Sequence, residues 1–105
     1  MYKNINKKEK LELKKEIEYQ KEQVVTLVQN SLVSVTLFSF DKGEEISTHA
    51  AGGDALVTVL EGKGKFIIDN EEYILNEGES IIMPKDIPHA VYGEEQFKML
   101  LIVSF

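Results

Sequence analysis

Two histidines, His49 and His89, carry the only imidazole groups in this chain of 105 residues, and the chain contains no cysteine. The lack of cysteine excludes disulfides, thiolate metal ligands and a cysteine nucleophile. Imidazole nitrogens can bind a metal ion, form hydrogen bonds with a small polar ligand, or act as acid or base near neutral pH. We therefore expect the chemistry of the protein to depend on these two side chains.

The charged residues limit the partners that the protein can bind. All 12 basic residues are lysine, so no guanidinium group can hold a carboxylate or phosphate through two parallel hydrogen bonds. The formal net charge is −6, distributed as +2 over residues 1–23 and −8 over residues 24–105. We therefore expect no nucleic-acid partner. No apolar run approaches the roughly 18 residues of a membrane span, so we also expect no membrane partner and a cytoplasmic location.

The sequence divides into a charged N-terminal segment and an all-β domain. Residues 1–23 are rich in lysine and glutamate, and their large apolar residues are spaced irregularly, so at most one short helix fits there. From residue 24 onward, runs of β-branched and aromatic residues recur about every 8–12 positions with turn residues between them. We predict an N-terminal arm or short helix over 1–23 and one β domain over 24–105. The predicted strands are Val24–Val28, Leu32–Phe40, Ile46–His49, Ala55–Leu60, Lys65–Ile68, Glu72–Leu75, Ser80–Met83, Ala90–Tyr92 and Phe97–Phe105.

Two of these strands are apolar on both faces for part of their length. In Leu32–Phe40, apolar residues first alternate with serine and threonine, but Phe38 and Phe40 then place large apolar groups on the polar side. The segment Met99–Val103 is similar. One wall of a small sandwich needs fewer apolar residues than this. We expect a homodimer that buries the surplus, and the alternative is two central strands covered on both sides within one subunit.

Two segments carry glycines, a proline and both histidines at regular spacings. The first is Gly43–Gly62, which contains His49, and the second is Gly78–Gly93, which contains Pro84 and His89. They resemble the two motifs of the cupin superfamily, G-x5-H-x-H-x3,4-E-x6-G and G-x5-P-x-G-x2-H-x3-N. The resemblance implies a double-stranded β-helix jelly roll, an RmlC-like cupin barrel. It also implies that the two motif histidines converge inside that barrel.

The chain departs from the family pattern at two of the four usual metal ligands. Ala51 stands where the family has its second histidine, and Ala55 stands where it has its glutamate. Asp54 is a candidate third ligand beside the histidines, but it precedes the glutamate position by one residue and should face the opposite side of the strand. A bulge at Gly52-Gly53 would reverse that parity. We prefer to interpret Asp54 as a turn residue that bonds nearby backbone amides.

The missing ligands leave a recess beside two imidazoles. Ala51 and Ala55 provide space in this pocket, and Met83 is a further pocket residue unless it only packs in the core. We expect the protein to bind a small molecule around His49 and His89. The resemblance implies binding through a divalent metal (Zn, Fe, Mn or Ni), and the alternative is binding without metal. It also leaves open a metal-dependent enzyme of dioxygenase, isomerase or decarboxylase type acting on a small polar metabolite, so we assign no catalytic residue.

Overall fold

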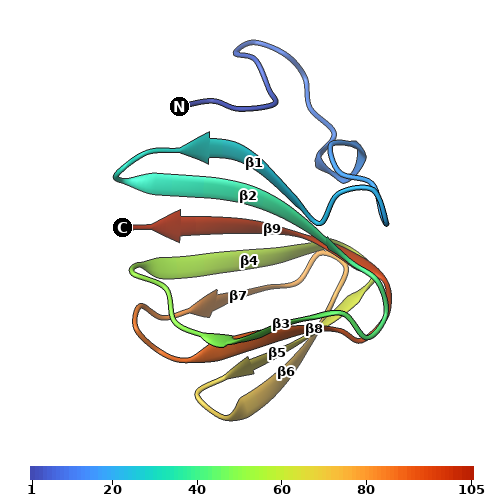
Figure 1. Ribbon diagram of the computed structural model, residues 1–105, viewed down its shortest axis with the longest axis vertical. Helices are drawn as coiled ribbons and strands as arrows, with labels where there is room; N and C mark the ends of the chain where they lie inside the picture. The colour runs from blue at the N-terminus through green and yellow to red at the C-terminus, as the bar shows by residue number, and fades with distance from the viewer.

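The computed structural model describes residues 1–105 and contains nine strands in two antiparallel sheets that pack face to face (Figure 1). The larger sheet has the order β1-β2-β9-β4-β7, and the smaller sheet has the order β3-β8-β5-β6. One 3-10 helix, η1, covers Leu13–Lys15. The strands are β1 (Val24–Gln29), β2 (Val33–Phe40), β3 (Glu45–His49), β4 (Asp54–Glu61), β5 (Lys63–Ile68), β6 (Glu71–Asn76), β7 (Ser80–Met83), β8 (His89–Gly93) and β9 (Phe97–Ser104). The predicted all-β jelly roll is confirmed.

All nine predicted strands are present, and their bounds differ from the prediction only at the turns. The strand predicted to begin at Leu32 begins at Val33 instead. Two hydrogen bonds to the Asn30 side chain explain the later start. Asn30 Oδ1 accepts them from the backbone N–H groups of Leu32 and Val33, at 2.8 and 3.0 Å. This local bonding closes the turn before the strand can start.

The hairpin between β4 and β5 is tighter than the sequence predicts. The prediction gives the turn four residues, but only Gly62 lies between the two strands. Gly62 has φ of +82°, and a Cβ atom there would collide with the backbone carbonyl of Gln96. Glycine is therefore required at this position both for its conformation and for the close approach.

The main core lies between the two sheets and contains 12 buried residues. Phe40, Phe66 and Phe97 are fully buried there. The rings of Phe40 and Phe97 stack with centroids 4.7 Å apart, and Phe66 meets Phe97 edge to face at 6.2 Å. Aromatic packing of this kind holds the two sheets at a fixed separation.

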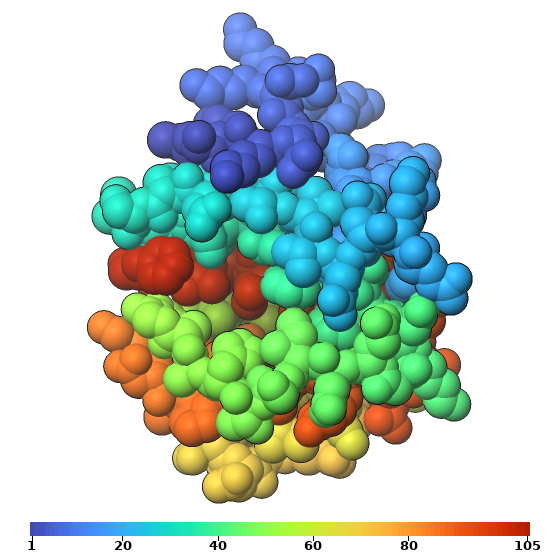
Figure 2. Space-filling model, in the orientation of Figure 1, coloured from blue at the N-terminus to red at the C-terminus, as the bar shows by residue number.

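The N-terminal arm covers part of the outer face of the larger sheet. In Figure 2 the arm, in dark blue, lies against the strands that follow it in the chain. Ile17 is fully buried in a second cluster with Val25, Leu27 and Leu37. Part of the surplus apolar surface of the central strands is thus covered within one subunit, as the alternative interpretation expected. The homodimer and the division of the chain into residues 1–23 and 24–105 stay predictions.

Polar contacts also fix the arm to the sheet. Lys98 Nζ donates to the backbone oxygen of Lys14 and lies 4.9 Å from the centroid of the Tyr19 ring. The Tyr19 hydroxyl donates to Glu61 Oε2 at 2.7 Å. Burial, together with the neighbouring carboxylate, raises the pKa of Tyr19. The arm is therefore anchored to β4 and β9 through one aromatic side chain.

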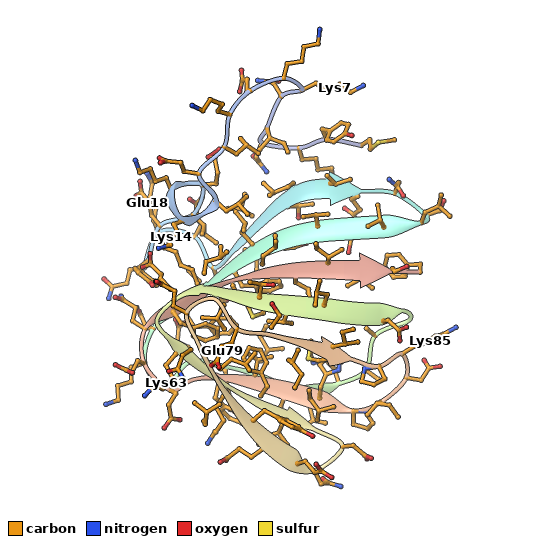
Figure 3. All side chains as sticks on the ribbon, turned by 180° about the vertical axis from the view of Figure 1, so that it is seen from behind. Lys7, Lys14, Glu18, Lys63, Glu79 and Lys85 are labelled. Atoms are coloured by element: carbon orange, nitrogen blue, oxygen red, sulfur yellow. The ribbon has the colours of Figure 1, made fainter.

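The remaining charged side chains lie outside the barrel. Lys7, Lys63 and Lys85 point away from the space between the sheets (Figure 3). The ion pairs join partly exposed side chains, and such pairs contribute only about 0–1 kcal/mol each. None of the helical segments has the length and hydropathy that crossing a bilayer requires.

Replacing Ile17 by alanine tests the cover that the arm provides. Because the Ile17 side chain is fully buried, Ile17→Ala should lower the free energy of unfolding by about 2–5 kcal/mol. Leu11 lies in the same arm with 36% of its surface exposed, and Leu11→Ala should lower that free energy by less than about 1 kcal/mol. Urea unfolding followed by circular dichroism measures both. Equally small losses would mean that the arm does not pack on the sheet.

Candidate functional site

A small cavity opens between the two sheets at the end where β3 meets β8 and β4 meets β7. Its volume is about 60 Å³, and nine of its 11 lining residues are hydrophobic. All five residues expected from the sequence to form the pocket line it. The full lining is Phe38, Ile46, His49, Ala51, Ala55, Met83, His89, Val91, Met99, Leu101 and Val103.

The two histidines are direct neighbours across β3 and β8. His49 is the last residue of β3, His89 is the first residue of β8, and the strand register pairs them. Their ring centroids are 4.3 Å apart with the planes at 72°, and the two Nε2 atoms are 3.1 Å apart. His89 is only 3% exposed, whereas His49 is exposed and forms the rim of the cavity. The fold thus brings together two side chains that are forty residues apart in the chain.

Each ring also has a backbone carbonyl oxygen within hydrogen-bond distance of its other nitrogen. Nδ1 of His49 lies 2.9 Å from the backbone oxygen of Ser47, and Nδ1 of His89 lies 3.2 Å from that of Ile87. A carbonyl oxygen can only accept, so we assign the proton of each neutral ring to Nδ1. Both Nε2 atoms then carry lone pairs, and these lone pairs face each other. Two acceptors at this distance together form a site for a hydrogen-bond donor or a cation.

The surroundings of His89 disfavour an added proton on its ring. Burial lowers the pKa of His89, and a charge on His49 lowers it further, against a smaller opposite effect of the hydrogen bond to Ile87. No lysine, aspartate or glutamate lines the cavity. The His89 ring is therefore neutral near pH 7, and its Nε2 atom meets a ligand as an acceptor.

The structure does not bring Asp54 to the histidines. Its Oδ1 accepts the backbone N–H of Lys85 at 2.8 Å, and its side chain does not line the cavity. Strand parity is the reason, because Ala55 faces the cavity and the preceding residue faces away. The chain has no cluster of three or more histidine, cysteine, aspartate or glutamate side chains that could hold a metal ion. The ligand set that the cupin resemblance implies, three histidines and a carboxylate, therefore does not fit this chain.

Sequence analysis does not identify six of the lining residues. They are Phe38, Ile46, Val91, Met99, Leu101 and Val103. The last three alternate along β9 and share its inward face, which is a period-two signal. That signal is weak in the sequence because this strand is apolar on both faces, so neither face stands out.

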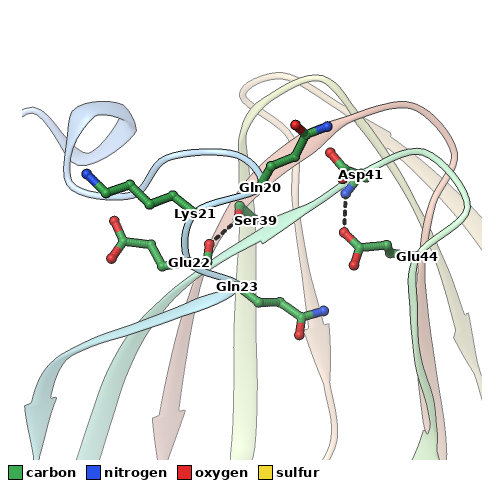
Figure 4. Close-up of a pocket in the computed structure, with 7 residues that line it drawn as sticks. All are labelled: Gln20, Lys21, Glu22, Gln23, Ser39, Asp41 and Glu44. Carbon is green, nitrogen blue, oxygen red and sulfur yellow. Dashed lines mark hydrogen bonds between the residues drawn. The ribbon is translucent and has the colours of Figure 1, made fainter.

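A larger cleft, lined by the end of the arm together with the end of β2 and the turn that follows it, contains neither histidine. Its volume is about 350 Å³, and none of its lining residues is hydrophobic. Figure 4 shows two hydrogen bonds within the lining: Ser39 Oγ donates to the backbone oxygen of Glu22, and the backbone N–H of Asp41 donates to Glu44 Oε1. The lining residues are Gln20, Lys21, Glu22, Gln23, Ser39, Asp41 and Glu44. The cleft is open to solvent, and its lining residues form hydrogen bonds with each other. It therefore presents no group that requires a ligand.

Comparisons with known proteins agree with the fold. The sequence profile described as the cupin domain matches residues 36–103. The crystal structure of SPY1581, a conserved protein of unknown function from Streptococcus pyogenes, has a TM-score of 0.90 at 44% identity, over 99% of this chain and 94% of that one. A cupin superfamily protein from Desulfitobacterium hafniense DCB-2 has a TM-score of 0.88 at 32% identity, over 100% and 98%. An uncharacterized protein from Aquifex aeolicus is 30% identical over 93 residues, which are 88% of this chain and 77% of that protein. These matches confirm the resemblance indicated by the two motifs.

Titration of His89 tests the electrostatics of the pair. The pKa of His89 should lie below the value of about 6.5 for an unperturbed histidine. In His49→Phe the neighbouring charge is lost and an apolar ring remains, so the pKa should rise but stay below that value, because burial is the larger cause. Imidazole proton NMR as a function of pH measures both proteins. A His89 pKa above about 6.5 in the wild type would contradict the description of the site.

The lowered pKa of His89 also predicts that the folded protein is less stable in acid. Since the unfolded chain takes up this proton more readily than the folded chain, the free energy of unfolding should fall as the pH drops below about 6.5. Above that pH the group contributes no pH dependence. Thermal unfolding at about pH 7.5 and about pH 5.5 should show a smaller decrease for His89→Gln than for the wild type, while the carboxylates contribute equally in both.

Proposed function

The chain belongs to the cupin domain family, and from the two imidazoles in its barrel we propose that it is a binding protein for a small ligand. The observation that carries the proposal is the pair of Nε2 acceptors, 3.1 Å apart, in an otherwise apolar cavity. Acceptors that face each other are satisfied only by a third group, which either donates hydrogen bonds or accepts electron pairs. The ligand therefore presents a hydrogen-bond donor or a metal centre to the imidazoles.

The lining supports an organic ligand that is uncharged and largely apolar. A charged molecule would lose its hydration there without gaining a counter-ion, because no charged side chain faces the cavity. An apolar group gains about 25 cal/mol for each Å² removed from water. A volume of about 60 Å³ suits a group of few atoms, and a larger molecule would extend past His49 at the rim.

An enzymatic role has less support than a binding role. A catalytic zinc usually has three protein ligands, and a mononuclear iron oxygenase site has two histidines and a carboxylate. His49 and His89 supply two nitrogens and no carboxylate. A dioxygenase, isomerase or decarboxylase that depends on a divalent metal is therefore the second candidate. The homodimer and the cytoplasmic location remain predictions.

Pyrrole and furan are a matched pair of probes for this site. They are five-membered rings of similar size, but only pyrrole has an N–H donor. Pyrrole should bind about fivefold more tightly than furan, because one hydrogen bond contributes about 1 kcal/mol. Titrations followed by the methyl NMR signals of Ala55 and Met83, both in the cavity lining, measure the two affinities.

Three variants complete the experiment. The double variant His49→Phe/His89→Phe removes both acceptors and should abolish the preference for pyrrole, and Ala55→Leu should abolish binding of both probes by filling the cavity. Leu56→Ile changes the opposite face of the same strand and should leave both affinities unchanged. The proposal fails if furan binds the wild type as tightly as pyrrole, or if Ala55→Leu binds both probes normally.

A further inference from the structure

The Nε2 atoms of His49 and His89 are close enough to accept hydrogen bonds from one and the same donor atom. The ring centroids are 4.3 Å apart but the Nε2 atoms are only 3.1 Å apart, so the Nε2 edges of the two rings face each other. Each Nδ1 lies beside a backbone carbonyl oxygen, at 2.9 Å in His49 and 3.2 Å in His89, which leaves Nε2 as the acceptor. A single donor atom can therefore lie at the usual hydrogen-bond distance of about 2.9–3.0 Å from both nitrogens.

A donor atom that carries two hydrogens suits this pair of acceptors best. Viewed from a donor at that distance, the two Nε2 atoms are separated by roughly 65°. The hydrogens of an NH₂ group are spread more widely, so each N–H bond would point within about 25° of its acceptor. This bend keeps both hydrogen bonds well above the angle of about 120° below which they weaken steeply. A donor with one hydrogen would leave one Nε2 atom without a partner from the ligand, so the pair favours a primary amino group over a hydroxyl or a secondary N–H group.

The rest of the lining determines which primary amines fit. An alkylamine is protonated at neutral pH, like the side chain of lysine, and no carboxylate lines the cavity to balance its charge. A carboxamide is neutral, but its carbonyl oxygen would find no donor among the side chains of the lining. An amino group on an aromatic ring is neutral at pH 7, because the ring delocalises its lone pair, and it brings no carbonyl oxygen. Aromatic amines are therefore the class that satisfies both imidazoles without burying an unpaired polar group.

We propose that the ligand is an aromatic primary amine whose NH₂ group donates one hydrogen bond to each Nε2 atom. This inference rests on the proposed function, because it names the chemical class of the donor that the cavity binds. The amino group lies in the cavity of about 60 Å³, and the ring extends from it toward the rim at His49. The lining includes apolar side chains for the ring to pack on, among them Phe38 and Leu101. A water molecule also offers two hydrogens, so burial of the ring gives the amine its advantage over solvent.

Aniline, phenol and toluene test the number of hydrogens that the pair requires. The three molecules have nearly the same shape and offer the pair two, one and no hydrogens. The wild type should bind aniline about fivefold more tightly than phenol, and phenol about fivefold more tightly than toluene, which is the usual effect of one hydrogen bond. Benzylamine carries its amino group as a cation at about pH 7.5 and should bind more weakly than toluene. Titrations followed by the methyl NMR signals of Ala55 and Met83 measure the four affinities.

Labelling with [¹⁵N]histidine and one pair of variants locate the contact. Aniline should shift the Nε2 signals of both histidines, and toluene should shift neither. In His49→Phe one acceptor remains, so aniline and phenol should bind with equal affinity, and both more tightly than toluene. His49 is exposed at the rim, so this variant should fold. Leu56→Ile lies on the opposite face of β4 and should keep the order of the wild type.

The outcomes separate this inference from the proposed function. Phenol that binds the wild type as tightly as aniline, or aniline that shifts the Nε2 signal of only one histidine, would overturn the inference. The proposed function would still stand in that case if pyrrole binds more tightly than furan. If toluene and furan bind as tightly as aniline and pyrrole, or if the wild type binds none of these probes, both proposals are wrong.

Discussion

Two imidazole nitrogens that both accept hydrogen bonds lie 3.1 Å apart across β3 and β8, and the character of the site depends on this contact. A hydrogen bond fixes the orientation of each ring, because its Nδ1 donates to the backbone carbonyl oxygen two residues earlier in the chain. The lone pairs of the two Nε2 atoms cannot form a hydrogen bond with each other. The surrounding side chains offer them no hydrogen-bond donor. The cavity is therefore organised around a group that is supplied from outside.

The jelly roll maintains this contact by burying apolar side chains on both faces of the larger sheet. On the inner face, Phe66 of the smaller sheet packs edge to face on Phe97 of the larger sheet and so holds the two sheets together. On the outer face, the N-terminal arm inserts Ile17 over Leu37, and Lys98 and Tyr19 fasten it. The arm lies outside the barrel, yet it supports the sheet whose inner face carries both cavity methionines.

The fold could largely be predicted from the sequence, because alternating apolar residues and turn residues are local signals. The motif spacing also located both histidines and the small side chains of Ala51 and Ala55 beside them. The burial of Ile17 could not be predicted, since the apolar residues of the arm have no regular spacing. Met99 was missed because its strand is apolar on both faces. The tautomers depend on where two carbonyl oxygens lie, which no residue pattern encodes.

In the ligand-free protein, both Nε2 atoms are free acceptors. Long-range ¹H–¹⁵N correlation NMR of the imidazole rings at about pH 7.5 tests it most directly, because it distinguishes a protonated from an unprotonated ring nitrogen. For His49 and His89 alike, we expect a protonated Nδ1 and an unprotonated Nε2. A proton on either Nε2 atom would contradict it, because the pair would then be a closed donor–acceptor contact with no need of a ligand.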